Sequence, residues 1–153
     1  MDSKEVLKEY FGYDSFRAGQ EDIINAILEK KDVLAIMPTG AGKSLCYQVP
    51  AMMLSGITVV ISPLISLMQD QVKSLNDVGI NAAYVNSTLS ESEIDGTLNM
   101  VLNGIYKIIY IAPERLESAK FCAPNILYLA FLDIIFLHLH IKCEYILLAI
   151  SLY

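Results

Sequence analysis

The stretch that decides the fold is Met-Pro-Thr-Gly-Ala-Gly-Lys-Ser at residues 37–44. It follows an apolar, β-branched run over residues 32–36, which is typical of a buried parallel strand, and no helix breaker comes between it and Pro50. A strand, a glycine loop and a helix N-terminus in this order let backbone N–H groups surround a polyphosphate. The strict pattern G-x-x-x-x-G-K-[ST] needs glycine where Met37 stands, and this chain has the shorter form T-G-x-G-K-S. We therefore predict a nucleotide site, against the alternative of a glycine turn that merely contains lysine.

Two side chains of this loop have a direct predicted role. Lys43 would place its ammonium against the outer phosphates, which makes it the candidate catalytic residue. The Ser44 hydroxyl would ligate Mg²⁺.

Composition sets limits on the class of protein. The chain has 153 residues, which fits one domain with a real core, and its net charge of −6 gives no bulk attraction for nucleic acid. Its three cysteines, Cys46, Cys122 and Cys143, are widely spaced and suit a reducing compartment. The charged N-terminus does not resemble a secretory signal, so we expect a cytoplasmic protein.

Strands and helices alternate along the chain. Helices are predicted over residues 2–11, 18–30, 44–49, 64–78 and 90–103, and strands over residues 32–36, 57–61, 82–85 and 106–111. This alternation predicts an α/β fold with a parallel sheet wound through right-handed crossovers. Because ligands of such sheets lie beyond the carboxyl ends of the strands, the glycine loop, Ser62-Pro63 and residues 112–115 should line one edge.

The segment F-G-Y-D-S-F-R-A-G-Q at residues 11–20 has two interpretations. A glutamine amide such as that of Gln20 can bond the outer edge of adenine, and aromatic and guanidinium planes can stack on its face. On spacing alone, Phe16 as a core residue and Arg17 and Gln20 as a solvated helix face explain the same pattern.

Four motifs together resemble the first lobe of RecQ-family DNA helicases. They are F-G-Y-x-x-F-R-x-G-Q at residues 11–20, M-P-T-G-x-G-K-S-L-C-Y-Q-V-P-A at 37–51, V-V-I-S-P-L-I-S-L-M-x-D-Q-V at 59–72 and Y-I-A-P-E-R-L at 110–116. The resemblance covers about residues 4–117, and four motifs agree in order and spacing. Ala41 stands where many members have a third glycine.

The resemblance implies a RecA-like lobe of a superfamily 2 motor that uses ATP and Mg²⁺ and moves 3′→5′ on DNA. It implies that Tyr13 and Arg17 sandwich adenine and that Gln20 reads the adenine edge. It implies that the phosphates and Mg²⁺ are held by Thr39, Gly40, Ala41, Gly42, Lys43 and Ser44.

Ser62, Pro63 and Leu64 would face the DNA backbone, and Arg115 is a further candidate DNA contact. A serine hydroxyl and turn amides beside a strand end can donate to phosphate oxygens without reading sequence. Local alternatives exist for these residues. Ser62 and Pro63 also fit a helix N-cap followed by proline at the first helical position, and Arg115 fits a structural pair with Glu114.

After Glu117 the motif pattern ends. A motor of this kind needs a carboxylate for Mg²⁺ and a glutamate that activates water, which the family supplies as D-E-A-H, and this sequence has no such tetrapeptide. Asp133 ends an apolar run at a comparable place, but Ile134 stands where the glutamate should be. We likewise expect no second motor lobe with its arginine finger in this chain. We therefore predict a partial RecA-like lobe at residues 1–117 that binds ATP without hydrolysing it or unwinding DNA.

Residues 118–153 form a very apolar tail. We expect a C-terminus that is out of frame with the ancestral gene, with a membrane span or a core strand–helix piece as alternatives. His138, His140 and Cys143 have some metal-ligand spacing but no fourth partner nearby, so we expect no zinc site.

The expected partner is DNA, single-stranded or as a 3′-tailed duplex, bound weakly. No protein partner is predicted, and a membrane is not expected. Two other classes stay open: a non-catalytic nucleotide-binding remnant, and a membrane-attached P-loop protein unrelated to DNA. The motifs at residues 11–20 and 62–72 argue against the last, because a generic P-loop protein needs neither.

Overall fold

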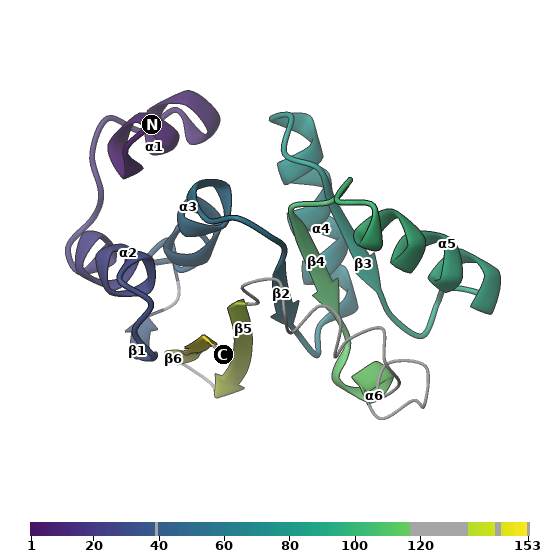
Figure 1. The fold of residues 1–153 in the computed structure, drawn as a ribbon. Helices are drawn as coiled ribbons and strands as arrows, with labels where there is room; N and C mark the ends of the chain where they lie inside the picture. Colours follow the sequence, from purple (N-terminus) through teal and green to yellow (C-terminus); the bar gives the residue numbers. More distant parts are fainter. Residues whose placement is uncertain (39, 117–134, 143–144, 153) are drawn as a thin grey trace.

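The computed structural model describes residues 1–38, 40–116, 135–142 and 145–152, the last two ranges through their backbone. Helices lie against a sheet that runs through the molecule (Figure 1). The helices are α1 (Ser3–Phe11), α2 (Gln20–Leu28), α3 (Leu45–Met53), α4 (Ile65–Asp77), α5 (Glu91–Leu102) and α6 (Pro113–Leu116). The strands are β1 (Val33–Pro38), β2 (Thr58–Ile61), β3 (Ala82–Val85), β4 (Ile108–Ile111), β5 (Ile135–Lys142) and β6 (Tyr145–Leu152).

The six strands lie in the order β1-β6-β5-β2-β4-β3. β2, β4 and β3 pair in parallel, with Val60 opposite Tyr110 and Tyr110 opposite Tyr84, which confirms the predicted α/β fold with parallel strands and flanking helices. β5 is parallel to β2, whereas β6 is antiparallel to both β5 and β1. β1 therefore points the same way as β2, β3 and β4, and the segments after these four strands leave the sheet at one edge, as predicted.

Helices cover both faces of the three parallel strands. On one face Val60 belongs to a buried cluster with Met68 of α4, and on the other Val59 belongs to a cluster with Ile94 of α5. Residues that alternate along β2 thus enter opposite cores, because successive side chains of a strand point to opposite faces. A third cluster joins α1, α2 and α3 through Val6, Leu7, Ile24 and Val49.

β1 forms where predicted but differs from a buried parallel strand. Ala35 and Met37 are buried against α2 and α3, whereas Leu34 and Ile36 are 68% and 66% exposed. The strand alternates because helices cover one of its faces only, among the residues that the structure describes. Its neighbour is the antiparallel β6, so the prediction of a parallel partner for this strand is wrong.

Capping boxes begin two of the predicted helices, α1 and α5. The Asp2 carboxylate accepts hydrogen bonds from the first turn of α1 while Glu5 bonds back to the Asp2 N–H at 2.7 Å. Ser90 and Glu93 make the same exchange at the start of α5. α1 ends at Gly12 with φ 72°, the left-handed conformation in which glycine meets no side-chain penalty.

Two helix boundaries differ from the prediction. α2 begins at Gln20, later than predicted, because Gly19 takes the N-cap position with φ 81°. α3 continues through Pro50 to Met53, although proline removes a helix hydrogen bond. The fully buried Val49 and the nearly buried Ala51 beside Pro50 show that packing holds the helix there.

The N-cap interpretation of Ser62 is wrong. α4 begins at Ile65 with Leu64 at its N-cap, and Ser62 is fully buried. The Ser62 N–H donates to the Ile111 carbonyl at 3.1 Å, so this residue extends the pairing of β2 with β4. Its hydroxyl accepts a long bond of 3.4 Å from the Leu64 N–H, which leaves Pro63 exposed in the turn.

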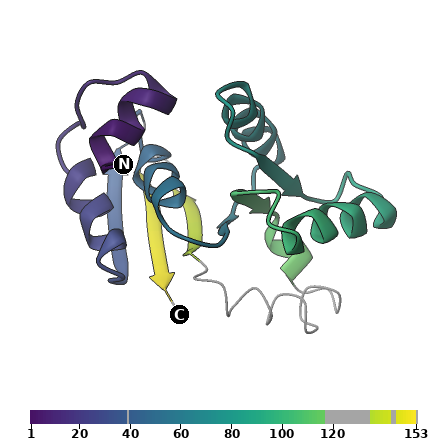
Figure 2. The same ribbon diagram turned by 45° about the horizontal axis from the view of Figure 1, so that its top comes forward.

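β5 and β6 form an antiparallel hairpin between β1 and β2, from Ile135 opposite Leu152 to Lys142 opposite Tyr145 (Figure 2). Of the structural alternatives for the tail, a sheet element fits this backbone arrangement. No helix in the described ranges has the length and apolar character needed to cross a membrane. The reading-frame hypothesis concerns the gene and stays a prediction. Asp133, Ile134 and Cys143 lie outside the described residues.

Candidate nucleotide site and nucleic-acid interface

The glycine loop lies between β1 and α3, where the sequence predicts it. Gly40 and Gly42 have φ values of 80° and 75°, so both loop glycines adopt the conformation that other residues avoid. A Cβ atom at Gly42 would lie 2.5 Å from the Gln20 Nε2 atom. Gly42 is therefore required twice, for its backbone angles and for the close approach of α2. Thr39 lies outside the described residues.

Lys43 is folded back onto its own loop. Its Nζ atom donates to the Pro38 carbonyl at 2.7 Å and to the Met37 carbonyl at 3.5 Å, and the residue is only 8% exposed. Desolvation lowers the pKa of this ammonium, because burial disfavours its charged form. The two carbonyls thus stabilise a buried cation at the place where the sequence predicts phosphate.

Arg17 and Gln20 contact the glycine loop. Arg17 Nη1 donates to the Gly40 carbonyl at 2.6 Å, and Gln20 Nε2 donates to the carbonyls of Ala41 and Gly42 at 3.2 and 2.9 Å. The Gln20 side chain also accepts from the Arg17 backbone N–H at 2.8 Å and is 1% exposed. The structure therefore joins the two motifs, and the interpretation of Gln20 as a solvated surface residue is wrong.

Tyr13 lies beside this cluster and is 52% exposed. A cavity of about 300 Å³ is lined by Tyr13, Gly42 and Ser44, together with residues of α1, α3 and α4. An exposed phenol ring at the mouth of a cavity that reaches the glycine loop is a surface on which a planar base can stack. Gln20 does not line this cavity, because its amide points into the loop.

Ser44 is the predicted Mg²⁺ ligand, and it is half-buried just before the first turn of α3. Within the described ranges, no group of three His, Cys, Asp or Glu side chains is arranged to hold a metal ion. Mg²⁺ in nucleotide sites typically keeps several waters and takes one or two protein oxygens plus phosphate oxygens. A single hydroxyl at this helix start fits a metal that arrives with its nucleotide.

Segments that follow β2, β3 and β4 meet at the same sheet edge. The Ala112 N–H donates to the Val85 carbonyl at 3.0 Å, as Ser62 does to β4. Of the predicted DNA contacts after β2, Pro63 is exposed and Leu64 is 44% exposed, whereas Ser62 has no exposed surface. The backbone of this turn is thus better placed than the Ser62 side chain to meet a partner.

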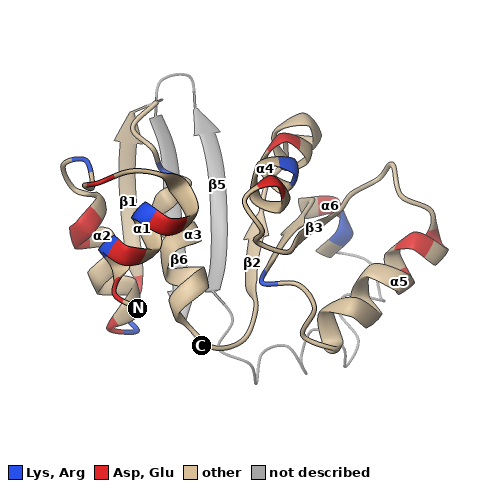
Figure 3. Cartoon of the chain, turned by 90° about the horizontal axis from the view of Figure 1, so that it is seen from above, with Lys and Arg blue, Asp and Glu red and all other residues tan. Residues whose placement is uncertain are grey.

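Arg115 lies at this edge on α6 and bonds the segment after β3. Its Nε atom donates to the Asn86 carbonyl at 3.2 Å, and its Nη1 atom lies 3.7 Å from a Glu91 carboxylate oxygen. Asn86 is fully buried, and its Nδ2 atom has no hydrogen-bond partner among the described residues. Arg115 therefore ties α6 to the β3–α5 connection. Charged residues elsewhere are mixed in sign, without a continuous basic surface on the described helices (Figure 3).

A buried polar network joins α3 to β4 and α4. Its residues were not among the predicted site residues. The hydroxyls of Tyr47 and Tyr110 lie 3.0 Å apart, with their rings edge to face at 6.5 Å and 72°. Gln48 donates to the Gln71 side chain at 3.0 Å. Burial raises the pKa of both phenols. The sequence did contain a signal for this network, namely Tyr47 and Gln48 in the helix after the glycine loop. Apolar side chains alone would have been enough for a helix that only fills the core.

A family model described as DEAD/DEAH box helicase matches residues 17–132 of this chain, a range that includes the glycine loop and the parallel strands β2, β3 and β4. The chain belongs to the DEAD/DEAH box helicase family. The match runs past Glu117, where the four motifs end.

Several ATP-dependent helicases are similar to the N-terminal region of this chain. It is 54% identical over 120 residues to the ATP-dependent DNA helicase RecQ of Bacillus subtilis, which covers 78% of this chain and 20% of that protein. It is 49% identical over 116 residues to the RecQ helicase of Haemophilus influenzae, covering 76% and 19%. The ATP-dependent helicase SGS1 of Saccharomyces cerevisiae is 45% identical over 120 residues, covering 76% and 8%. The chain thus spans about a fifth of the two bacterial helicases.

Proposed function

We propose that residues 1–117 are part of the nucleotide-binding first motor lobe of a RecQ-type 3′→5′ DNA helicase. The observation that carries the proposal is the direct bonding of Arg17 and Gln20 to the glycine loop. A bare glycine loop occurs in many P-loop proteins, whereas an arginine and a glutamine that hold its carbonyls unite two separate motifs in one site. The likeness to several ATP-dependent RecQ helicases supports the same assignment.

The loop would hold the triphosphate with its backbone N–H groups at the start of α3. Lys43 would leave the carbonyls of Met37 and Pro38 and place its ammonium on the outer phosphates. Bound Mg²⁺ neutralises phosphate charge, and the Ser44 hydroxyl would be its protein ligand. Lys43, Ser44 and the N–H groups at the start of α3 all lie in or beside the part of the loop that the structure describes.

Adenine would stack on Tyr13 at the mouth of the cavity beside the loop. Arg17 is predicted to cover the other face of the base, and Gln20 to read its edge. For that reading the Gln20 amide would have to give up at least one of its bonds to Arg17, Ala41 or Gly42. We therefore propose that selectivity for adenine requires the Gln20 amide to exchange a hydrogen bond to the loop for one to the base.

DNA would lie across the sheet edge formed by the turn after β2 and by α6. Backbone contacts near Pro63 and Leu64 would bind phosphates without regard to sequence. We expect weak and strongly salt-dependent affinity, because the chain has a net charge of −6 and offers few contacts. A membrane-attached P-loop protein unrelated to DNA is disfavoured by the RecQ motifs in this turn.

Hydrolysis is not expected of this chain by itself. Its sequence has no D-E-A-H tetrapeptide, and neither a water-activating glutamate nor an arginine finger can be assigned. An arginine finger alone is worth about 10³–10⁵ in rate. The proposal therefore includes nucleotide binding without turnover, which is also what a non-catalytic remnant would do.

The test begins with titration of labelled ATP and GTP in Mg²⁺ and in EDTA. We expect Mg²⁺-dependent binding that prefers ATP, and Lys43→Ala should weaken it roughly ten- to a hundredfold through the lost charge-assisted bonds. Equal affinity for ATP and GTP, unchanged by Gln20→Ala, would remove the adenine assignment.

Phosphate release with and without single-stranded DNA completes the test, with Lys43→Ala as the blank. DNA-stimulated release above that blank would show that Asp133 or another carboxylate replaces the missing motif, and the inactive-lobe proposal would be dropped.

A further inference from the structure

The helix that begins at the nucleotide loop is bonded to the strand that leads to Arg115. Tyr47 lies in the first turn of α3, is 1% exposed, and shares a hydrogen bond of 3.0 Å with Tyr110 of β4. The Ser44 carbonyl accepts from the backbone N–H groups of Tyr47 and Gln48 at 3.3 and 3.0 Å. The first turn of α3 thus joins the predicted Mg²⁺ ligand to the strand that leads to Arg115.

The next residue makes a parallel connection. Gln48 is 5% exposed and donates to Gln71 of α4 at 3.0 Å. α4 begins directly after Pro63 and Leu64, the exposed residues of the turn that follows β2. Two neighbouring polar side chains of α3 therefore reach the two elements that carry the predicted DNA contacts.

Stability alone does not require these polar groups. Phenylalanine at both tyrosine positions would bury almost the same apolar surface, and replacing both partners of a buried hydrogen bond is often nearly neutral. The surrounding cluster is otherwise apolar, with Cys46, Val60 and Met68 among its members. A hydrogen bond in such surroundings is directional and strong, so it fixes α3 relative to β4 in a way that apolar contact does not.

We infer that the Tyr47–Tyr110 hydroxyl pair, together with the Gln48–Gln71 amide pair, couples nucleotide binding at Ser44 to DNA binding at the segments after β2 and β4. The inference rests on the proposed function, because it assumes nucleotide at the loop and DNA at the sheet edge. A phosphate or Mg²⁺ at Ser44 would shift the start of α3, and the polar pairs would pass that shift to β4 and α4. The tyrosines act here as positioning residues, since neither touches a ligand.

The measured quantity is a coupling factor, the dissociation constant of a fluorescent ATP analogue without DNA divided by the constant with saturating single-stranded oligonucleotide. The full chain is used, with Mg²⁺ and at low salt, where backbone contacts to DNA are strongest. Coupling between two sites typically changes affinity by about 5- to 150-fold, and we expect the unaltered chain to fall in that range.

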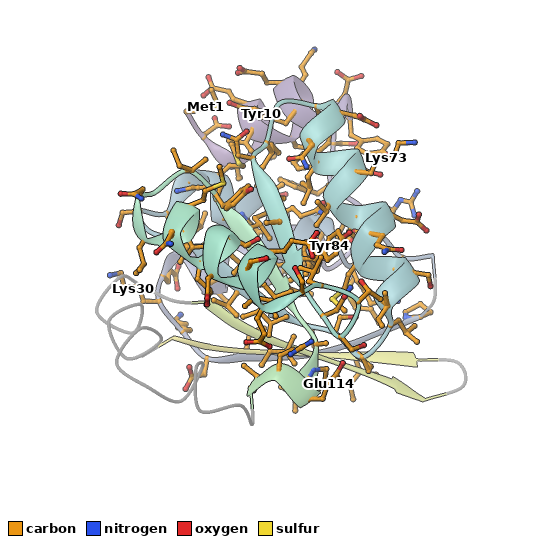
Figure 4. All side chains as sticks on the ribbon, turned by 90° about the vertical axis from the view of Figure 1, so that its right-hand side faces the viewer. Met1, Tyr10, Lys30, Lys73, Tyr84 and Glu114 are labelled. Carbon is orange, nitrogen blue, oxygen red and sulfur yellow. The ribbon has the colours of Figure 1, made fainter. Side chains whose placement is uncertain are left out.

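The variants are Tyr47→Phe, Tyr110→Phe and the double substitution. We expect the double variant to lower the coupling factor to within about twofold of one while the separate affinities for nucleotide and DNA change less than about threefold. Tyr84→Phe is the matched control, because Tyr84 lies opposite Tyr110 on the neighbouring strand β3 (Figure 4). Gln71→Met cuts the second connection at a half-buried helix position and serves if a tyrosine variant does not fold. Because Gln71 also lines the cavity beside the loop, this variant is judged by its coupling factor alone.

The outcomes separate the inference from the proposed function. If the unaltered chain binds no nucleotide, both the proposed function and the inference are overturned. If it binds nucleotide and DNA independently, or if the folded variants couple as well as Tyr84→Phe does, the inference alone is overturned. Lost coupling with retained separate affinities supports it, because a merely structural role would change melting temperature and leave the coupling factor unaltered.

Discussion

Gln20→Ala tests whether α2 holds the nucleotide loop. The side chain is 1% exposed and makes three hydrogen bonds, with the Arg17 N–H and with the carbonyls of Ala41 and Gly42. At about 1 kcal/mol for each bond, the free energy of unfolding should fall by about 3 kcal/mol. For a chain of this size that corresponds to a melting temperature lower by roughly 6–12 °C.

The assay is thermal unfolding followed by circular dichroism, with ATP titration of the folded variant. Gln20→Glu keeps an acceptor for Arg17 but places a buried carboxylate oxygen against the two loop carbonyls, which repel it, so this variant should melt no higher than Gln20→Ala. Gln69→Ala is the matched control at an exposed position of α4. If Gln20→Ala melts within about 1 °C of Gln69→Ala and binds ATP as tightly, the three hydrogen bonds of Gln20 do not hold the loop.

Four further substitutions test separate features. Gly42→Ala should cost about 1–2 kcal/mol from its left-handed backbone and weaken ATP binding, measured by the same melting and titration, because its Cβ would press on Gln20. Ser90→Ala should cost about 1 kcal/mol of unfolding free energy as a lost N-cap. Hydrogen bonding to Ser90 lowers the pKa of Glu93. The ionised Glu93 side chain therefore stabilises the fold above the usual glutamate pKa, and this stabilisation is lost as pH falls through the lowered pKa. The difference in melting temperature between Glu93→Gln and the unaltered chain should vanish in acid. Leu34→Lys should leave melting unchanged and reduce light scattering, since it breaks an exposed apolar strand face.

Local signals in the sequence predicted most of the secondary structure. Asp2 and Ser90 each begin a helix because a cap and its return bond lie within three residues, and such contacts are visible in sequence. Contacts between distant residues were not visible in this way. Ser62 fits a helix cap locally, but its N–H bonds Ile111 across the sheet, and that partner decides its structure.

The candidate site shows the same limit. Its residues were predicted from motif patterns, but the bonds from Arg17 and Gln20 to the loop depend on how α2 packs beside β1. The exposure of Leu34 could not be predicted either, because an apolar run does not say which of its faces is covered. Propensity and periodicity report what a segment prefers, whereas its neighbours decide what it touches.

The folded-back Lys43 side chain bears on which molecules can enter the site. An incoming ligand competes with two neutral carbonyl oxygens, those of Met37 and Pro38, for the same ammonium. A phosphate oxygen carries charge that the carbonyl oxygens lack, so we expect it to displace them from the ammonium, whereas adenosine has no anionic group that would do so. If the loop binds nucleotide as proposed, the two carbonyls would accept the ammonium again after release, so that no lone cation would be left in a poorly solvated loop. The site would then favour polyanions over neutral ligands, and the loop would keep its shape without one.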